Sequence, residues 1–433
     1  MSKVISSSKE GREIYKWAKQ IFKFNRSLTG SGTFDTLDFI KKKLPNFKIK
    51  KIKSGTKIYD WTIPNEWNVK KAYVEDLKGN KLINFNDNNL HLVGYSVPIN
   101  KIIKFKDLKK KLHTIEKMPS AIPYRYSYYS KDWGFCLEYK KLKLFKDKSY
   151  RVVIDSTLKK GHMHYGEILV KGKSSKEILL STYICHPSMG NNEVSGPVLL
   201  TRLAKYLLSK NNLYYSYRII FVPETIGALT YINKNYKILK KNVVAGYVVS
   251  CVGDNNNYSY LETKEKTSLS DKVAKTAFSL KKLKFKKYSF LQRGSDERQF
   301  NSPGVDLNIG SIMRTRHGYY KEYHTSLDNL DFISPDGFQG AYDIYTLVFD
   351  LLENNRVYKN LIIGEPFYTK YKLRSDTIGT GYNKNSLNIS NVCTYLDGNT
   401  DLIDLSKKLS LNFYEIVKII KILKHNKIIK MIS

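Results

Sequence analysis

The stretch EILLSTYICHPSMGNNEVSGPVLLTRLAKYLLSK, residues 177–210, contains the pattern that decides the fold. It begins with a continuous apolar run, breaks at a Gly/Asn-rich loop and continues as an apolar helical segment. The next apolar run, RIIFVPE, occupies residues 218–224. Because buried strands that alternate with crossover helices are typical of one architecture, this region is predicted to form an α/β layer with a mainly parallel sheet.

Short polar motifs follow the ends of these apolar runs. In open α/β sheets, ligands bind outside the carboxyl ends of the strands. The motifs gather His, carboxylate and amide groups, which can hold a metal ion and activate a water molecule. They read ICHPSMGNNEVSG (184–196), FVPETIG (221–227), GSDERQF (294–300) and EYHTSLDNLD (322–331).

The first two motifs offer a metal ligand and a base. His186 follows an apolar strand, where a neutral imidazole is a good zinc ligand. Glu193 lies seven residues later in the same loop. Glu224 ends the second apolar run, where a carboxylate can serve as a general base or cap the following helix, and these two roles are compatible.

The last two motifs add charged groups in the same order along the chain. His324 is placed to complete a metal site, and Glu322 and Asp328 lie beside it in sequence. Asp328 is expected to orient His324 or to cap the next helix. The GSDERQF motif places Asp296, Glu297 and Arg298 together, and Arg298 can hold a substrate carboxylate or pair with an acid.

The order CHP, NEVSG, ETIG, SDERQF and HTSLD resembles the zinc aminopeptidase superfamily that also contains glutaminyl cyclases. That superfamily reads H-x-D, D-x-A-S-G, E-E-x-G-L, S-D-H-x-x-F and H-T-x-x-D. The resemblance covers residues 1–45 and 150–355. It implies a zinc-aminopeptidase-like (phosphorylase/hydrolase-like) mixed sheet flanked by helices. It also implies zinc ligation by His186 and His324, catalysis by Glu224, and support from Asp296 and Asp328.

Several carboxylates of the superfamily pattern are replaced in this chain. Asn192 stands at the place of the aspartate that bridges two zinc ions, and Thr225 stands at the place of a glutamate ligand. A further aspartate ligand would fall at Ser250 or Cys251. Two zinc ions held mainly by neutral groups would carry excess buried charge, so the sequence does not favour a two-zinc site.

One zinc ion fits the remaining groups better. Three protein ligands and a water are the usual catalytic arrangement. The predicted ligands are His186, Glu193 and His324. Cys251 or Asp254 is an alternative ligand.

The chain is predicted to contain three domains. A discontinuous aminopeptidase-like domain spans residues 1–50 and 150–358 and includes the strand RVVIDS at 151–156. Short alternating runs separated by Asn, Gly and Pro turns indicate a strand-rich inserted domain at 51–149, with a helix at 104–117. The pattern of helices followed by a short strand resembles a winged helix at 365–433.

The composition bears on the partners. The net charge of +35 favours a polyanion partner if it clusters on one face. The lysines are spread along the whole chain, which instead favours a lysine-biased proteome. The winged helix offers Asn426 but few forked side chains for reading base edges, so contact with another protein or a second copy is preferred to nucleic-acid binding.

The cysteines and the hydropathy bear on location. The four cysteines are scattered without paired spacing, which favours reduced thiols in a cytoplasmic protein. No segment approaches about 20 consecutive apolar residues, so no membrane span is expected.

The sequence therefore favours a zinc-dependent hydrolase that acts on a small peptide or on an acylamino group. Members of the bacterial branch that it resembles are often associated with polysaccharide biosynthesis. A non-catalytic binding or scaffold protein of the same fold is the main alternative, and a winged-helix nucleic-acid-binding regulator is the third.

Overall fold

The computed structural model describes residues 9–373 and 384–432, which form two compact units. The first unit runs to Asp271 and resumes from Lys282 to Tyr345. The second contains Lys272–Lys281 and the chain from Thr346 onward. The strand-rich segment predicted at 51–149 lies within the first unit.

An eight-stranded mixed sheet forms the centre of the first unit. Its four middle strands, β12, β11, β13 and β16, are parallel, and antiparallel strands flank them on both sides. The predicted α/β layer with a mixed sheet is therefore confirmed. In spatial order the strands are β1 (Lys48–Lys53), β10 (His162–Val170), β12 (Ser216–Val222), β11 (Glu177–Tyr183), β13 (Val243–Val248), β16 (Ile309–Met313), β14 (Ser259–Leu261) and β15 (Lys286–Tyr288).

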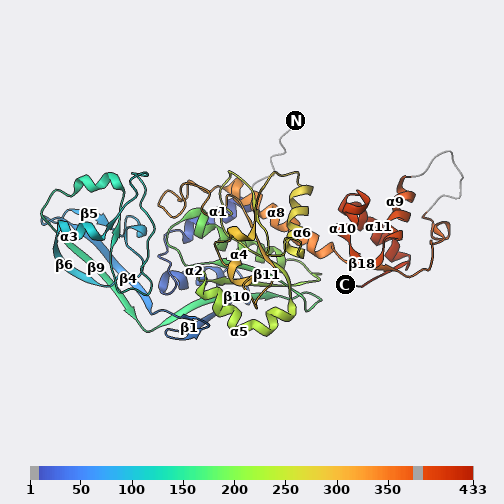
Figure 1. Cartoon of the computed structure of the whole chain (residues 1–433), viewed down its shortest axis with the longest axis horizontal. Coiled ribbons are helices and arrows are strands. Elements are labelled where there is room, and N and C mark those ends of the chain that lie inside the picture. The colour runs from blue at the N-terminus through green and yellow to red at the C-terminus, as the bar shows by residue number, and fades with distance from the viewer. Residues whose placement is uncertain (1–8, 374–383, 433) are drawn as a thin grey trace. The chain divides into compact units, whose positions relative to one another are not determined.

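Strand β11 lies in the middle of this sheet, and each of its residues is buried. The chain crosses from β11 to β12 through α4, and from β12 to β13 through α5, which lie on opposite sides of the sheet in Figure 1. The helices of this unit, including two that extend into the second, are α1 (Lys9–Ile21), α2 (Ser31–Lys41), α3 (Phe105–Leu108), α4 (Ser195–Leu208), α5 (Ile226–Asn242), α6 (Leu269–Leu280), α7 (Glu297–Phe300) and α8 (Pro335–Asn354).

The start of α4 lies very close to the sheet, and this explains the SG pair of the first motif. A Cβ atom added at Gly196 would lie 2.3 Å from Thr182 Oγ1 and 2.5 Å from the carbonyl oxygen of Val249. Because a glycine lets two backbones approach this closely, α4 can begin directly against β11 and β13. The loop that carries His186 is therefore held against the carboxyl end of the sheet.

The inserted segment contains a separate four-stranded antiparallel sheet, in the order β5 (Lys81–Asn84), β4 (Glu66–Glu75), β9 (Ser149–Lys159) and β6 (Ile99–Lys104). Two short ribbons accompany it, β2 (Lys57–Ile58) with β3 (Trp61–Thr62), and β7 (Leu112–His113) with β8 (Phe135–Cys136).

Two predictions in this region were wrong. The RVVIDS strand lies in this antiparallel sheet as part of β9, because it pairs with β4 and β6. The helix predicted at 104–117 is limited to α3 and a short 3-10 turn, Lys109–Lys111. Within these two elements Leu108 is buried, so this lysine-rich segment has no apolar stripe to hold a longer helix against the core.

The second unit contains the winged-helix part of the chain. A three-stranded antiparallel sheet is formed by β18 (Asp397–Asp401), β17 (Val357–Asn360) and β19 (Ile429–Met431). The helices are α9 (Lys384–Thr394), α10 (Leu402–Leu409) and α11 (Phe413–His425). Because β17 pairs with β18 and β19, the sheet of this unit takes in residues before position 365. The buried side chains of α10 and α11 include Leu402, Ile403, Leu405, Phe413, Ile416, Ile419 and Ile420.

None of the helices in the described parts of the chain is both long enough and apolar enough to cross a bilayer.

Buried His91 is expected to make the stability of the first unit depend on pH. Its ring is 3% exposed, and its Nδ1 lies 2.7 Å from the carbonyl oxygen of Cys136. Burial lowers the pKa of His91 below its ordinary value of 6.5, against the opposing effect of this hydrogen bond. Below about pH 6.5 the unfolded chain gains a proton at this position that the folded chain does not, so stability falls as the pH drops.

A His91→Gln variant lacks this titration. As the pH falls below 6.5, the free energy of unfolding of the wild type should therefore decrease relative to that of the variant. The decrease should be up to about 1.4 kcal/mol per pH unit. Denaturant unfolding of both proteins between pH 8 and pH 5 measures the difference. Parallel pH profiles would contradict the prediction.

Candidate active site

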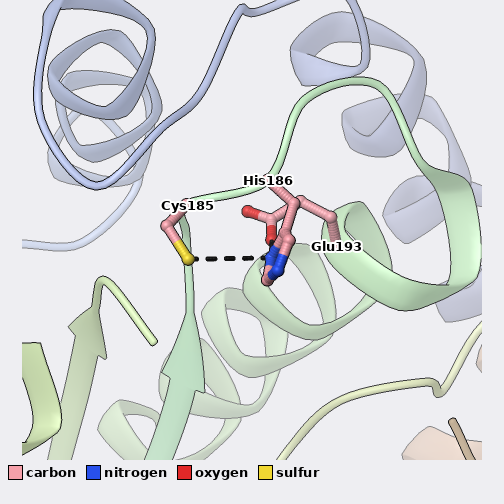
Figure 2. A group of neighbouring side chains, drawn as sticks. All are labelled: Cys185, His186 and Glu193. Carbon is pink, nitrogen blue, oxygen red and sulfur yellow. Dashed lines mark hydrogen bonds and ion pairs between the residues drawn. The ribbon is translucent and has the colours of Figure 1, made fainter. Parts of the chain in front are cut away.

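The loop after β11 places three side chains of the first motif around one imidazole ring. His186 Nδ1 lies 2.9 Å from Glu193 Oε2 and 3.6 Å from Cys185 Sγ. Figure 2 shows Cys185 at the end of the strand and Glu193 reaching the ring from the helical turn that follows. That turn is the π-helical segment η4 (Gly190–Val194), which is buried throughout. All three side chains are nearly inaccessible to solvent.

A buried cation lies on the other side of Glu193. Arg26 Nε lies 3.3 Å from Glu193 Oε1, and the two side chains are fully buried. The same Nε–H group donates to the carbonyl oxygen of His186 at 2.9 Å. The guanidinium therefore fixes both the carboxylate that holds the imidazole and the backbone that carries it.

The surroundings of His186 raise its pKa, so a metal ion at Nε2 would have to displace a proton there. Burial by itself lowers the pKa of His186, but Cys185, Tyr124 and the hydrogen bond to Glu193 together raise it well above the ordinary value. With Nδ1 donating to Glu193, the other ring nitrogen, Nε2, points to the remaining groups of the site. Nε2 lies 3.7 Å from Glu224 Oε2.

Glu224 lies in the turn that joins β12 to α5. Ser295 Oγ donates to Glu224 Oε1 at 2.6 Å, and the Glu224 amide donates to Cys185 Sγ at 3.2 Å. The Glu224 side chain is 22% exposed, whereas that of His186 is 5% exposed. One carboxylate oxygen is thus held by a hydroxyl, while the other lies near the imidazole.

The residue after Glu224 has a strained backbone that two other predicted residues hold. Thr225 has φ of +63°, a conformation that a β-branched residue adopts only at a cost of about 1–3 kcal/mol. Its amide donates to Asp296 Oδ1 at 2.7 Å, and Arg298 Nη2 donates to its hydroxyl at 2.7 Å. Asp296 and Arg298 therefore support the turn that presents Glu224. Burial and then the charge of Glu224 raise the pKa of Asp296 well above its usual value.

His324 lies beside His186 from the opposite loop. The centroids of the two rings are 5.7 Å apart, and the Tyr323 ring stacks on His324 at 3.9 Å. His324 Nε2 is buried without a hydrogen-bond partner among the described residues. Burial, followed by the nearby His186 and His317, lowers the pKa of His324 to about 3, so its imidazole is neutral at neutral pH.

Asp328 fixes the loop that carries Glu193. Its two carboxylate oxygens accept the amide protons of Asn191 at 2.6 Å and Asn192 at 2.9 Å, and Tyr320 donates to the same carboxylate at 3.1 Å. The side-chain oxygen of Asn192 accepts from Tyr183 at 2.9 Å. Burial raises the pKa of Asp328 to about 7 against these hydrogen bonds. Asp328 and Asn192 thus act on the loop rather than on the imidazoles.

The alternative ligands and Glu322 lie outside this group. Asp254 accepts hydrogen bonds from the Asn191 side chain and from both the amide and the hydroxyl of Thr315. Cys251 is buried, and its thiol lies 4.0 Å from the Tyr320 hydroxyl. Glu322 contributes its backbone carbonyl to the turn around Thr325, and its carboxylate lies 4.0 Å from Lys321 Nζ.

Sequence reasoning missed several residues of the site. Ser295 adjoins Asp296 in the GSDERQF motif, so its position was a usable signal. Arg26 and Tyr124 had no such signal, because each lies far from the motifs in sequence. Tyr124 contacts both imidazoles, with ring centroids 5.3 Å from each.

Two sets of side chains bring potential metal-ligating atoms near one another. Cys185, His186 and Glu193 place one ligand atom each within 4.8 Å of one another. Burial raises the pKa of the Cys185 thiol to about 11, however, and Arg26 lies against Glu193. The second set contains His186 Nε2 and the unpaired Nε2 of His324, with Glu224 beside them. Among the described residues the ligand atoms of this set are further apart than those of the first, but the set has an orphaned ligand atom and no adjacent guanidinium, which both favour a cation.

The Arg26–Glu193 pair should be strongly coupled in stability. Arg26→Met leaves a buried carboxylate without its cation, which costs about 3–5 kcal/mol of unfolding free energy. In the double variant with Glu193→Gln, part of this loss should be recovered, because no buried charge then remains unpaired. Denaturant unfolding of wild type, both single variants and the double variant gives the coupling energy. Losses that simply add would show that the two groups do not interact.

Known families match both parts of the chain. A family model described as a domain of unknown function (DUF4910) matches residues 15–355, and one described as a winged helix-turn-helix matches residues 356–431. A Clostridium acetobutylicum protein named for polysaccharide biosynthesis and an aminopeptidase-like domain is 42% identical over 413 residues, which are 95% of this chain and 94% of that protein.

Solved structures show the same architecture. A Clostridium acetobutylicum crystal structure described as that of a candidate peptidase has a TM-score of 0.91 at 41% identity, covering 98% of this chain and 97% of the other. A zinc aminopeptidase from Bacillus subtilis has a TM-score of 0.56 at 14% identity, covering 80% and 95% of the two chains, and shows the fold alone. The chain therefore belongs to the DUF4910 family, with an aminopeptidase-like fold and a C-terminal winged helix.

Proposed function

We propose that this chain is a hydrolase of an amide or peptide bond that uses one zinc ion, held by His186 and His324. The observation that carries the proposal is the hydrogen bond from His186 Nδ1 to the buried carboxylate of Glu193. A carboxylate on one ring nitrogen orients a histidine so that the other nitrogen can bind a metal. Here that nitrogen lies 3.7 Å from Glu224 Oε2, whose side chain is 22% exposed, and the unpaired Nε2 of His324 lies on the neighbouring ring.

The proposal gives Glu193 a different role from the direct zinc ligand predicted from the sequence. Its two oxygens already lie against His186 and Arg26, at 2.9 Å and 3.3 Å. A metal on these oxygens would also be next to the guanidinium charge, which opposes binding. Glu193 is therefore assigned to orienting His186.

Glu224 is assigned the role of general base. A zinc ion in this site would supply Lewis acidity and lower the pKa of its bound water to about 7. Ser295 holds one oxygen of Glu224, and the other oxygen faces His186, so it is free to accept a proton from a water beside that ring. The same carboxylate can pass the proton to the departing amine. Asp296 and Arg298 maintain the strained turn that keeps Glu224 in place.

The substrate is proposed to be a small peptide or an acylamino group on a sugar precursor. The name of the Clostridium acetobutylicum relative supports a link to polysaccharide biosynthesis. Replacement of family carboxylates by Asn192 and Thr225 supports the competing proposal, a binding protein that has lost catalysis. The two proposals differ in what they require of Glu224, because a binding protein does not need a base there.

For the winged helix we propose contact with protein rather than sequence-specific reading of nucleic acid. Lys418, Lys421 and Lys424 on α11 are exposed, which can support sequence-independent attraction to phosphates. The Asn426 amide donates back to the carbonyl oxygen of Ile422 at 3.0 Å. The one amide that the sequence offered for base edges is thus engaged within its own helix.

Purified protein should contain about one zinc ion per chain, and Glu224→Gln should keep that metal while losing activity. Removing a general base is expected to lower the rate of amide hydrolysis by about 10²- to 10⁴-fold. Elemental analysis after purification without chelator, and hydrolysis of a set of short peptides and N-acylated amino sugars, measure the two quantities. Glu322→Gln is the matched control, since Glu322 carries the same charge and lies in the loop of His324 without holding the histidines.

His324→Ala should lose both the metal and the activity, because it removes one of the two proposed ligands. Metal content that survives in both His324→Ala and His186→Ala would contradict the proposed site. Absence of metal from the wild type, together with unchanged stability in chelator, would favour the binding protein.

A further inference from the structure

We infer that the inserted domain is part of the active site and that its Tyr124 is a positioning residue for His186 and His324. The inference rests on the proposed function only where it names these histidines as metal ligands. The contact between the inserted segment and the histidine loop is a feature of the fold, and it can be tested without any metal.

A short stretch of the inserted domain pairs directly with the loop that carries His324. Pro123 and Thr325 form an antiparallel bridge. The Tyr124 amide donates to the carbonyl oxygen of His324 at 2.9 Å. One residue away, the Ser326 amide donates to the carbonyl oxygen of Ile122 at 2.9 Å, and the Ile122 amide donates to Ser326 Oγ at 3.0 Å. The backbone from the His324 carbonyl to Ser326 is thus fixed by residues about 200 positions earlier in the chain.

His324 needs this support because its backbone is strained. Its φ is +57°, in the left-handed region that non-glycine residues seldom adopt. Such a conformation costs about 1–3 kcal/mol and persists where surrounding contacts determine it. The hydrogen bond from Tyr124 is made to the carbonyl of His324 itself. Removing the inserted strand would leave this residue free to relax away from His186.

The side chain of Tyr124 acts on both rings at once. Its ring centroid lies 5.3 Å from that of His186 at 70° and 5.3 Å from that of His324 at 85°. Both are edge-to-face arrangements, which are attractive for aromatic rings. Because the same tyrosine ring packs against both imidazoles, it sets the space between them. A smaller side chain would let the two rings change their separation.

The other side of this stretch is anchored in the inserted domain. The Gly94 amide donates to the carbonyl oxygen of Arg125, and the Ser127 amide donates to that of Gly94, both at 2.9 Å. Tyr126 also forms a bridge with Gly94. Residues 122–127 are therefore hydrogen-bonded to the inserted domain on one side and to the histidine loop on the other. Through them the inserted domain determines where His324 lies.

The test uses full-length protein with Tyr124→Leu, Tyr124→Phe and the control Tyr129→Leu. Tyr129 is 55% exposed, comes from the same segment and hydrogen-bonds to the carbonyl oxygen of Thr62. Cobalt(II) serves as the probe, because its visible absorption reports ligand geometry. Tyr124→Leu should weaken cobalt binding about 10- to 100-fold and change the absorption spectrum. Tyr124→Phe keeps the ring and should bind within about threefold of wild type, as should Tyr129→Leu.

A second measurement needs no metal. In histidine-selective ¹⁵N spectra of the metal-free protein, the ring signals of His186 and His324 should move more in Tyr124→Leu than in Tyr124→Phe. Cobalt affinity and ring signals that are unchanged in Tyr124→Leu would overturn the inference. A wild-type protein that binds no cobalt would refute the proposed function, while the ring signals would still decide the inference.

A milder variant covers the case in which Tyr124→Leu fails to fold. Ser326→Ala removes the acceptor of the Ile122 amide and leaves every aromatic ring in place. It should shift the His324 ring signals and leave those of His91 unchanged. Unchanged His324 signals in this variant would overturn the backbone part of the inference.

Discussion

The buried contact between Arg26 and Glu193 is the interaction on which the site depends. A carboxylate taken out of water needs a partner, and here it has a guanidinium on one oxygen and an imidazole on the other. Since Arg26 also binds the carbonyl oxygen of His186, it joins the loop after α1 to the end of the central strand β11. The orientation of His186 follows from this arrangement, because its Nδ1 is committed to Glu193. The metal binding proposed at His186 Nε2 depends on this hydrogen bond between Nδ1 and Glu193.

Sequence reasoning reached the features that are local in the chain. The apolar run of β11, the glycine that starts α4 and the positions of His186, Glu224 and His324 all follow from short patterns. Two predictions were wrong because the same sequence pattern is compatible with more than one structure. The RVVIDS run is apolar enough to be a buried strand of the parallel sheet. It is instead part of β9, which is an inner strand of the antiparallel sheet, between β4 and β6. The lysine-rich stretch at 104–117 has helical propensity without the buried face that would stabilise it.

The rest of the site could not be predicted because its contacts join distant segments. Arg26 lies 160 residues from His186, and Tyr124 lies 200 residues from His324. Neither belongs to a motif, and no spacing rule connects them to the histidines. The same limit applies to Glu193. In the sequence an acid near a histidine can be a metal ligand, as predicted, or an orienting group, and the position of Arg26 supports the orienting role that we propose.

A metal site with few charged ligands needs its remaining ligands to be held firmly in position. With Asn192 and Thr225 at the positions of two acids in the superfamily that the sequence resembles, the proposed metal site has less negative charge with which to hold metal ions. A site with fewer charged ligands must rely more on how well those ligands are positioned, since binding then depends on geometry rather than on electrostatic attraction. This chain holds His186 through Glu193 and His324 through the stretch at 122–127. This stretch, which pairs with the histidine loop, therefore supplies rigidity where the proposed site lacks charge.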